Sequence, residues 1–190
     1  IVATATPVAV KCNGGSDGAV NLTVTGGTPA YTYTWSNTPA STTQNLTNVT
    51  AGTYTVTITD QNGCTRTATA TVTEPAALVV TATPTNISCN GGTGAVTLTV
   101  TGGTPNYTYL WSNNPASTTQ NLTNVPAGTY TVTVADQNGC TRTATATVTQ
   151  PTALTVTATP TNILCNGLQT GAVTLTVNGG TPNYTYLWSN

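Results

Sequence analysis

The sequence predicts an all-β protein made of tandem antiparallel β-sandwich repeats of about 76 residues. Three observations lead to this fold class. Apolar and polar residues alternate with the period of two that is typical of strands with one wet face. Turn sequences rich in Gly, Pro and Asn separate these segments at short, regular spacing, and no segment has a helical period. The tryptophans at positions 35, 111 and 188 lie 76 and 77 residues apart, which is the length of a domain.

The repeat boundaries follow from proline and from a variable loop. The segments "TEPAA" (residues 73–77) and "TQPTA" (149–153) interrupt the alternation, because Pro cannot donate to a sheet. The repeats differ in length only where "CNGGSDGAV" becomes "CNGGTGAV" and then "CNGLQTGAV", which indicates a surface loop. The predicted domains are a first repeat at 1–75, a second at 76–151 and a partial third at 152–190 that holds only the first strands.

Six strands are expected in the first repeat, at residues 2–10, 19–25, 31–36, 42–49, 53–59 and 65–73. With six strands, the first and last should run antiparallel, so that Cys12 and Cys64 lie at the same end of the sandwich. A seventh short strand near residues 37–41 would instead separate these cysteines. The sequence leaves both arrangements open.

Alternation also assigns the faces of the strands. Tyr54, Val56 and Ile58 share one face in "GTYTVTITD", and the intervening threonines share the other. The Tyr that enters this strand after a Gly turn resembles a tyrosine corner, in which the hydroxyl returns to nearby backbone. Tyr130 has the same place in the second repeat. Together with a Trp expected beneath the opposite sheet, this pattern predicts that each sandwich is immunoglobulin-like.

An aromatic stripe follows the "GGTP" turn of each repeat, and two interpretations of it compete. The stripe consists of Tyr31, Tyr33 and Trp35 in the first repeat and of Tyr107, Tyr109 and Trp111 in the second. Shared parity within a strand favours core packing. Aromatic faces also suit sugar rings, so a glycan platform is the less favoured alternative. The aligned threonines of "CTRTATATVT" offer a further alternative, an ice-binding surface, although a solvated strand face is the more common role.

Charge and composition exclude several function classes. Lys11, Arg66 and Arg142 are the only cationic side chains, and the net charge is −1, so no basic patch exists for nucleic acid. No run of 18 apolar residues is present, and we expect no direct membrane insertion. Solubility is expected to come from Thr, Ser, Asn and Gln.

The sequence also argues against catalysis. It contains no His and no GxSxG elbow, and its four carboxylates form no local pair. "DQNG" resembles the start of a calcium loop, but the other acidic ligands and the closing Glu are absent, so a plain hairpin turn is favoured. We therefore predict no enzyme activity, no cofactor and no metal site.

Five cysteines without CxxC spacing indicate disulfides formed in an oxidising compartment. Pairs within each repeat, Cys12 with Cys64 and Cys89 with Cys140, would close loops worth about 4 kcal/mol on the chain-entropy model. Cys165 would then have its partner outside the chain. A rival pattern joins Cys64 to Cys89 and Cys140 to Cys165 across the junctions, but it requires the linker to fold back. Both patterns remain open.

"GGTPNYTYLWSN" (102–113), followed by "TTQNLTNVPAGTYTVTVADQNGCT" (118–141), closely resembles the repeat of the SprB family of giant surface adhesins of gliding Bacteroidota. The resemblance covers each full repeat, including the "CNGG" loop. It implies an extracellular, cell-attached filament of many immunoglobulin-like repeats, exported by the type IX secretion system and acting in adhesion or gliding motility.

The leading functional hypothesis is structural: a stalk that projects an adhesive element from the cell. Its expected partners are neighbouring copies of the same repeat, and surface glycans if the repeats themselves bind. The incomplete third repeat raises a further alternative, completion of its sandwich by strands from another molecule, as in donor-strand assembly.

Overall fold

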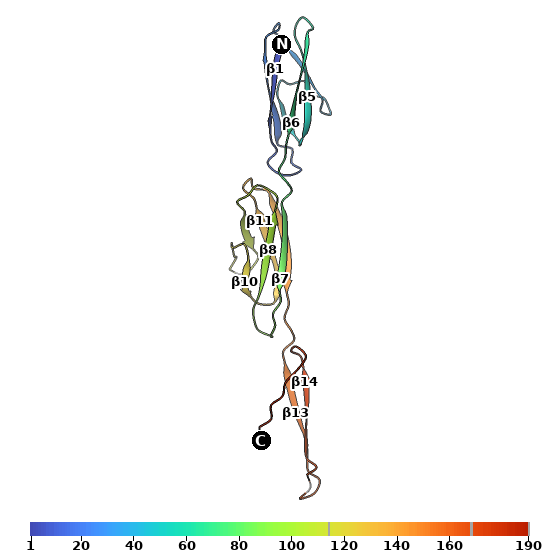
Figure 1. The fold of residues 1–190 in the computed structure, drawn as a ribbon, viewed down its shortest axis with the longest axis vertical. Coiled ribbons are helices and arrows are strands. Elements are labelled where there is room, and N and C mark those ends of the chain that lie inside the picture. Colours follow the sequence, from blue (N-terminus) through green and yellow to red (C-terminus); the bar gives the residue numbers. More distant parts are fainter. Residues whose placement is uncertain (114, 168, 190) are drawn as a thin grey trace. The chain divides into compact units, whose positions relative to one another are not determined.

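The computed structural model describes residues 1–113, 115–167 and 169–189. Asn190, the last residue of the third aromatic stretch, and Leu168 of the third cysteine loop lie outside the described residues. Strands β1 to β6 fall in the first predicted repeat, β7 to β12 in the second, and β13 and β14 in the third (Figure 1). Two compact units are distinguished: residues 1–80 with 100–108 and 134–142, and residues 81–99, 109–133 and 143–190.

Two three-stranded antiparallel sheets build the first repeat. One sheet has the order β1-β2-β4 and the other the order β3-β5-β6. The strands are β1 (Val2–Val8), β2 (Gly18–Thr25), β3 (Thr32–Trp35), β4 (Leu46–Val49), β5 (Gly52–Thr59) and β6 (Thr65–Val72). The antiparallel, all-β immunoglobulin-like sandwich predicted from the sequence is confirmed.

The second repeat has the same pair of sheets, in the orders β10-β8-β7 and β12-β11-β9, and the third contributes a two-stranded sheet. Their strands are β7 (Val79–Thr85), β8 (Gly94–Thr101), β9 (Thr108–Trp111), β10 (Leu122–Val125), β11 (Gly128–Ala135), β12 (Thr141–Val148), β13 (Thr155–Thr161) and β14 (Ala172–Asn178). The boundaries assigned to the repeats from proline stay predictions.

Trp35 is the largest side chain in the core of the first repeat. It is 1% exposed and packs in one cluster with Val20, Val56 and Ile58, which are fully buried. Its indole Nε1 donates to Thr43 O at 2.9 Å, so burial leaves no polar atom of the ring unpaired. On β3, Trp35 lies opposite Val56 of β5, and this register places the ring between the two sheets.

The expected strand directions need a correction. Strands β1 and β6 end together, because Val10 N donates to Thr73 O at 2.9 Å just beyond both strands. They therefore run parallel, although the repeat has six strands. Residues 36–45, which contain no strand, connect β3 to β4 with both strands running in the same direction. The possible seventh strand near residues 37–41 is a turn held by Trp35 N donating to Ser41 O.

Replacing Trp35 by Ala should lower the free energy of unfolding of the first repeat by about 3 to 5 kcal/mol, because it leaves a large cavity between the sheets. Trp188 is a matched control in the third copy of the same stretch, where the side chain is 55% exposed. Trp188→Ala should change the stability by less than about 0.5 kcal/mol. Urea unfolding followed by far-ultraviolet circular dichroism measures both, and equal midpoints for the two variants would contradict the role of Trp35.

Candidate functional site: the Cys12–Cys140 disulfide

The first component of the site is the hairpin turn between β11 and β12, residues 136–140, which we call the cysteine hairpin of the second repeat. Asp136 N donates to Cys140 O at 3.0 Å, and Gly139 adopts a φ of +81°. Only Gly accepts that conformation at little cost, which explains the Asn-Gly sequence of the turn. The Asp136 carboxylate holds the turn from inside: its Oδ1 accepts from Asn138 N at 3.0 Å and from Cys140 N at 2.9 Å.

The Asp136 carboxylate also ties the hairpin to the preceding "GGTP" turn, because its Oδ2 accepts from Thr104 N at 2.8 Å. The hydrogen bond from Thr104 N is the largest cause that lowers the pKa of Asp136 below 3.8, while desolvation by burial opposes it. The N–H groups of Cys140 and Asn138 lower the pKa further. Hydrogen bonds to a carboxylate favour its charged form, so Asp136 is a structural anion.

The second component is the loop of residues 11–15 after β1, the cysteine loop of the first repeat. Gly15 N donates to Cys12 O at 2.9 Å, which closes the turn. Asn13 Nδ2 donates to Pro75 O at 3.1 Å and Gly14 N donates to the Glu74 carboxylate, so the loop is fastened to the segment that leaves β6. The sequence alone suggested no role for Glu74. In the structure its carboxylate accepts a hydrogen bond from the backbone of the cysteine loop.

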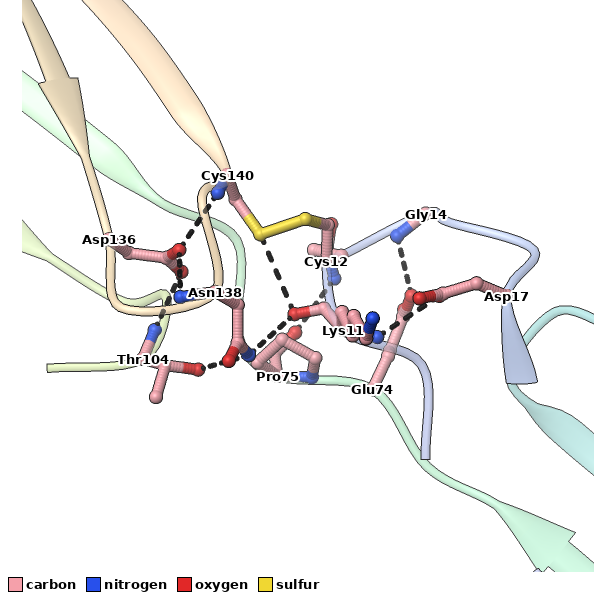
Figure 2. The surroundings of a disulfide bond; sticks show 11 residues. Lys11, Cys12, Gly14, Asp17, Glu74, Pro75, Thr104, Asp136, Asn138 and Cys140 are labelled. Carbon is pink, nitrogen blue, oxygen red and sulfur yellow. Dashed lines mark hydrogen bonds between the residues drawn. A yellow bond between two sulfur atoms is a disulfide. The ribbon is translucent and has the colours of Figure 1, made fainter. Parts of the chain in front are cut away.

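A disulfide joins the two components. Cys12 and Cys140 are bonded with their Cα atoms 5.7 Å apart, and Figure 2 shows the hairpin and the loop facing each other across the sulfur atoms. Asn138 Nδ2 donates to Lys11 O at 3.0 Å and to Thr104 Oγ1 at 2.9 Å, so it fixes the loop backbone beside the bond. The bonded Cys140 Sγ carries no proton and lies 3.5 Å from the same Lys11 oxygen.

Both cysteine pairings expected from the sequence are wrong. Cys12 bonds to Cys140, and Cys64, Cys89 and Cys165 are exposed free thiols. The reason lies in the strand directions. Cys12 follows the end of β1, beside the end of β6, whereas Cys64 precedes the start of β6. Eight residues of strand at ~3.3 Å each keep Cys12 and Cys64 about 25 Å apart.

The aromatic side chains proposed from the sequence have structural contacts. Trp111 is buried like Trp35, and its Nε1 donates to Thr119 O at 3.0 Å. In the stripe, the Tyr31 hydroxyl donates to Gly26 O at 2.8 Å, and the Tyr107 hydroxyl donates to Gly102 O at 2.6 Å. Tyr33 and Tyr109 are half-buried. At the expected tyrosine corners, Tyr54 donates to Thr50 O at 2.9 Å and Tyr130 to Pro126 O at 2.8 Å.

Among residues 1–113, 115–167 and 169–189, no three His, Cys, Asp or Glu side chains gather closely enough to hold a metal ion. No helix able to cross a bilayer occurs in the same ranges.

We expect Asp136→Asn to destabilise the protein near neutral pH, because the neutral amide replaces an anion that three backbone N–H groups stabilise. The native pKa is lowered, so the contribution of Asp136 is complete above 3.8 and is lost as the pH falls through the lower native pKa. The difference in free energy of unfolding between wild type and variant should therefore disappear in acid. Urea unfolding at a series of pH values from neutral to below 3.8 measures it.

Glu74→Gln is the matched control for this change. The second repeat carries Gln150 at the corresponding position, and its Oε1 accepts from Gly91 N at 2.9 Å. Glu74→Gln should leave the stability nearly unchanged. A stability difference for Asp136→Asn that persists unchanged in acid would contradict the assignment of the lowered pKa.

Several solved structures are similar in fold to this chain at low identity. A C-terminal 282-residue fragment of intimin, solved in complex with the translocated intimin receptor intimin-binding domain, matches with 17% identity and a TM-score of 0.39, over 82% of this chain and 67% of the fragment. The amphioxus IgVJ-C2 molecule matches with 13% identity and a TM-score of 0.33, over 76% of this chain and 96% of that one.

The eight N-terminal immunoglobulin domains of Down syndrome cell adhesion molecule match with 17% identity and a TM-score of 0.34, over 79% of this chain and 24% of that one. No curated protein matches the sequence of this chain. The SprB repeat family matches it three times, at residues 4–39, 81–116 and 157–190, which together make up more than half of its length. The chain therefore belongs to the SprB repeat family.

Proposed function

We propose that this chain is a load-bearing segment of an extracellular bacterial filament or adhesin stalk, and that its repeats project an adhesive element from the cell. One observation carries the proposal: the disulfide between Cys12 and Cys140 spans a sequence separation of 128 residues. It joins the cysteine loop of one repeat to the cysteine hairpin of the next. A bond in this place resists separation of consecutive repeats.

The mechanical consequence follows from the path of the covalent bonds. Tension applied to the two ends of the chain passes through the disulfide and bypasses all residues between Cys12 and Cys140. Strands β2 to β11 lie in that bypassed segment. Pairings that lie wholly inside that segment, β2 with β4 and β3 with β5, are thus shielded from the load while the bond is intact, whereas β1, which pairs with β2, stays in the loaded path.

Family membership and the disulfide together support a place outside the cell. Disulfides persist in oxidising environments, and SprB-type repeats resemble those of surface adhesins. By the same resemblance, we propose a cell-surface filament of Bacteroidota, exported by the type IX secretion system, with a role in adhesion or gliding motility. Neighbouring repeats are the proposed partners along the chain.

A glycan-binding role for the repeats has less support. Trp35 and Trp111, which a sugar platform would have to present, are each 1% exposed. Stacking against a sugar ring requires an accessible ring face. The adhesive ligand therefore belongs, in this proposal, to another element that the stalk carries.

Single-molecule pulling from the two ends of the chain tests the load-bearing role. With the disulfide intact, the bypassed segment between the two cysteines, which are 128 positions apart, should contribute no extension. Reduction should release roughly 420 to 460 Å of additional contour length, at 3.3 to 3.6 Å per residue. The double variant Cys12→Ser with Cys140→Ser should show that length without reductant. Cys64→Ser keeps the disulfide and serves as the control. Equal extension in oxidised and reduced chains would overturn the proposal.

A further inference from the structure

The peptide bond between Lys11 and Cys12 lies directly beside the disulfide. We propose that this bond is a processing site for a secreted protease specific for basic residues. The closed joint protects the bond until the Cys12–Cys140 disulfide is reduced. Cleavage here cuts the loaded path between β1 and the disulfide, and that consequence rests on the proposed function. The site itself rests on the contacts of Lys11.

A protease specific for basic residues has few places to act on this chain. Lys11, Arg66 and Arg142 are its only cationic side chains. Arg66 and Arg142 are the second residues of β6 and β12. On β6 the register pairs Arg66 with Ile58 of β5, so the peptide bond after Arg66 lies inside a sheet. Proteolytic nicking favours exposed loop tips, and both arginines are therefore poor sites.

Lys11 lies outside the strands, at the start of the cysteine loop of the first repeat. Its side chain is exposed. The residues that follow it, "CNGGSDG", are small or polar, which is the composition of loops that proteases cut. The corresponding positions of the other two cysteine loops hold Ser88 and Leu164, which such a protease does not recognise. Lys11 therefore distinguishes the first cysteine loop from the others.

The carbonyl of Lys11 is the group that a protease has to reach. A serine protease attacks the carbonyl carbon and binds the oxygen in its oxyanion hole. In the joint, Lys11 O accepts from Asn138 Nδ2 at 3.0 Å and lies 3.5 Å from Cys140 Sγ. Figure 2 shows this oxygen facing the Asn138 amide and the disulfide. The oxygen cannot enter an oxyanion hole while the cysteine hairpin occupies this position.

The backbone is anchored on both sides of the bond. On one side, Cys12 is fixed through its disulfide. On the other side, Lys11 N donates to Asp17 Oδ1 at 3.1 Å. The preceding residue, Val10, is 3% exposed, and its N–H donates to Thr73 O at 2.9 Å. With both ends held, the segment cannot leave the joint to enter the active site of a protease.

Reduction removes one of these anchors and leaves the other. A small-molecule thiol such as glutathione attacks one sulfur of the disulfide and expels the other as a thiolate, and a second thiol then releases the mixed disulfide. Two small thiols are oxidised to one disulfide, and Cys12 and Cys140 become thiols. Because Val10 stays in the core, the loop opens by fraying from its Cys12 end, which is a local motion of low cost.

Hydrolysis of the bond releases the chain at this point. One water is added, which leaves a carboxylate on Lys11 and an amino group on Cys12. Residues 1–11 are then held by noncovalent contacts, chiefly the pairing of β1 with β2. Tension that the covalent path carried now acts on this pairing alone. The site thus acts as a release point in the stalk.

Limited proteolysis of the whole chain by trypsin tests the proposal. One sample keeps its disulfide, and the other is reduced and freed of reductant. Thiols are capped with iodoacetamide in both, and intact mass spectrometry follows the products over time. We expect cleavage after Lys11 to be about tenfold faster or more in the reduced chain, because the rate follows the population of the open loop. The double variant Cys12→Ser with Cys140→Ser should be cut at the same site without reduction.

A pair of variants with the disulfide intact isolates the contact at the carbonyl. Asn138→Ala removes the donor to Lys11 O, so cleavage after Lys11 should become severalfold faster. Asn62 is the matched control, because it has the corresponding place in the first repeat and donates to Thr28 Oγ1 at 2.8 Å. Asn62→Ala should leave the rate of cleavage after Lys11 unchanged.

Three results would overturn the proposal. They are equal rates in the intact and reduced chains, equal effects of the two asparagine variants, and a first cleavage after Arg66 or Arg142. The last would mean that reduction unfolds the sheets rather than opens the loop. The pulling experiment is independent of all three, because it depends on the disulfide and involves no protease.

Discussion

The hydrogen bond from Val10 N to Thr73 O is the contact on which the arrangement of the site depends. It fixes the end of the first strand beside the end of the last one, so that β1 and β6 run in the same direction. The cysteine loop that follows β1 therefore lies next to the segment that leads to the second repeat. The second repeat keeps the same contact, from Ile87 N to Thr149 O at 2.9 Å.

The acidic residues have structural roles in the turns and loops. Asp136, Asp60 and Glu74 each accept backbone N–H groups in turns or loops. Where the second repeat replaces Glu74 by Gln150, an amide oxygen takes over the same acceptor role. The side chains that would be the first candidates for acid–base chemistry are thus structural acceptors at the two ends of each sandwich.

The disulfide changes what an array of repeats can do mechanically. Isolated sandwiches in series unfold one by one when pulled, since each bears the full load. A bond from the cysteine loop of one repeat to the cysteine hairpin of the next transfers the load past the strands between them.

The sequence by itself determined the strands, the turns, the buried Trp35 and the family. Alternation, Asn-Gly turns and the repeat can all be recognised in the sequence without knowing which residues are in contact. The tertiary structure alone decided the direction of β6 and hence the partner of Cys12. That direction depends on how residues 36–45 connect β3 to β4, a segment with no periodic pattern. The pairing of cysteines 128 residues apart could not be read from spacing, because it follows from which ends of two sandwiches meet.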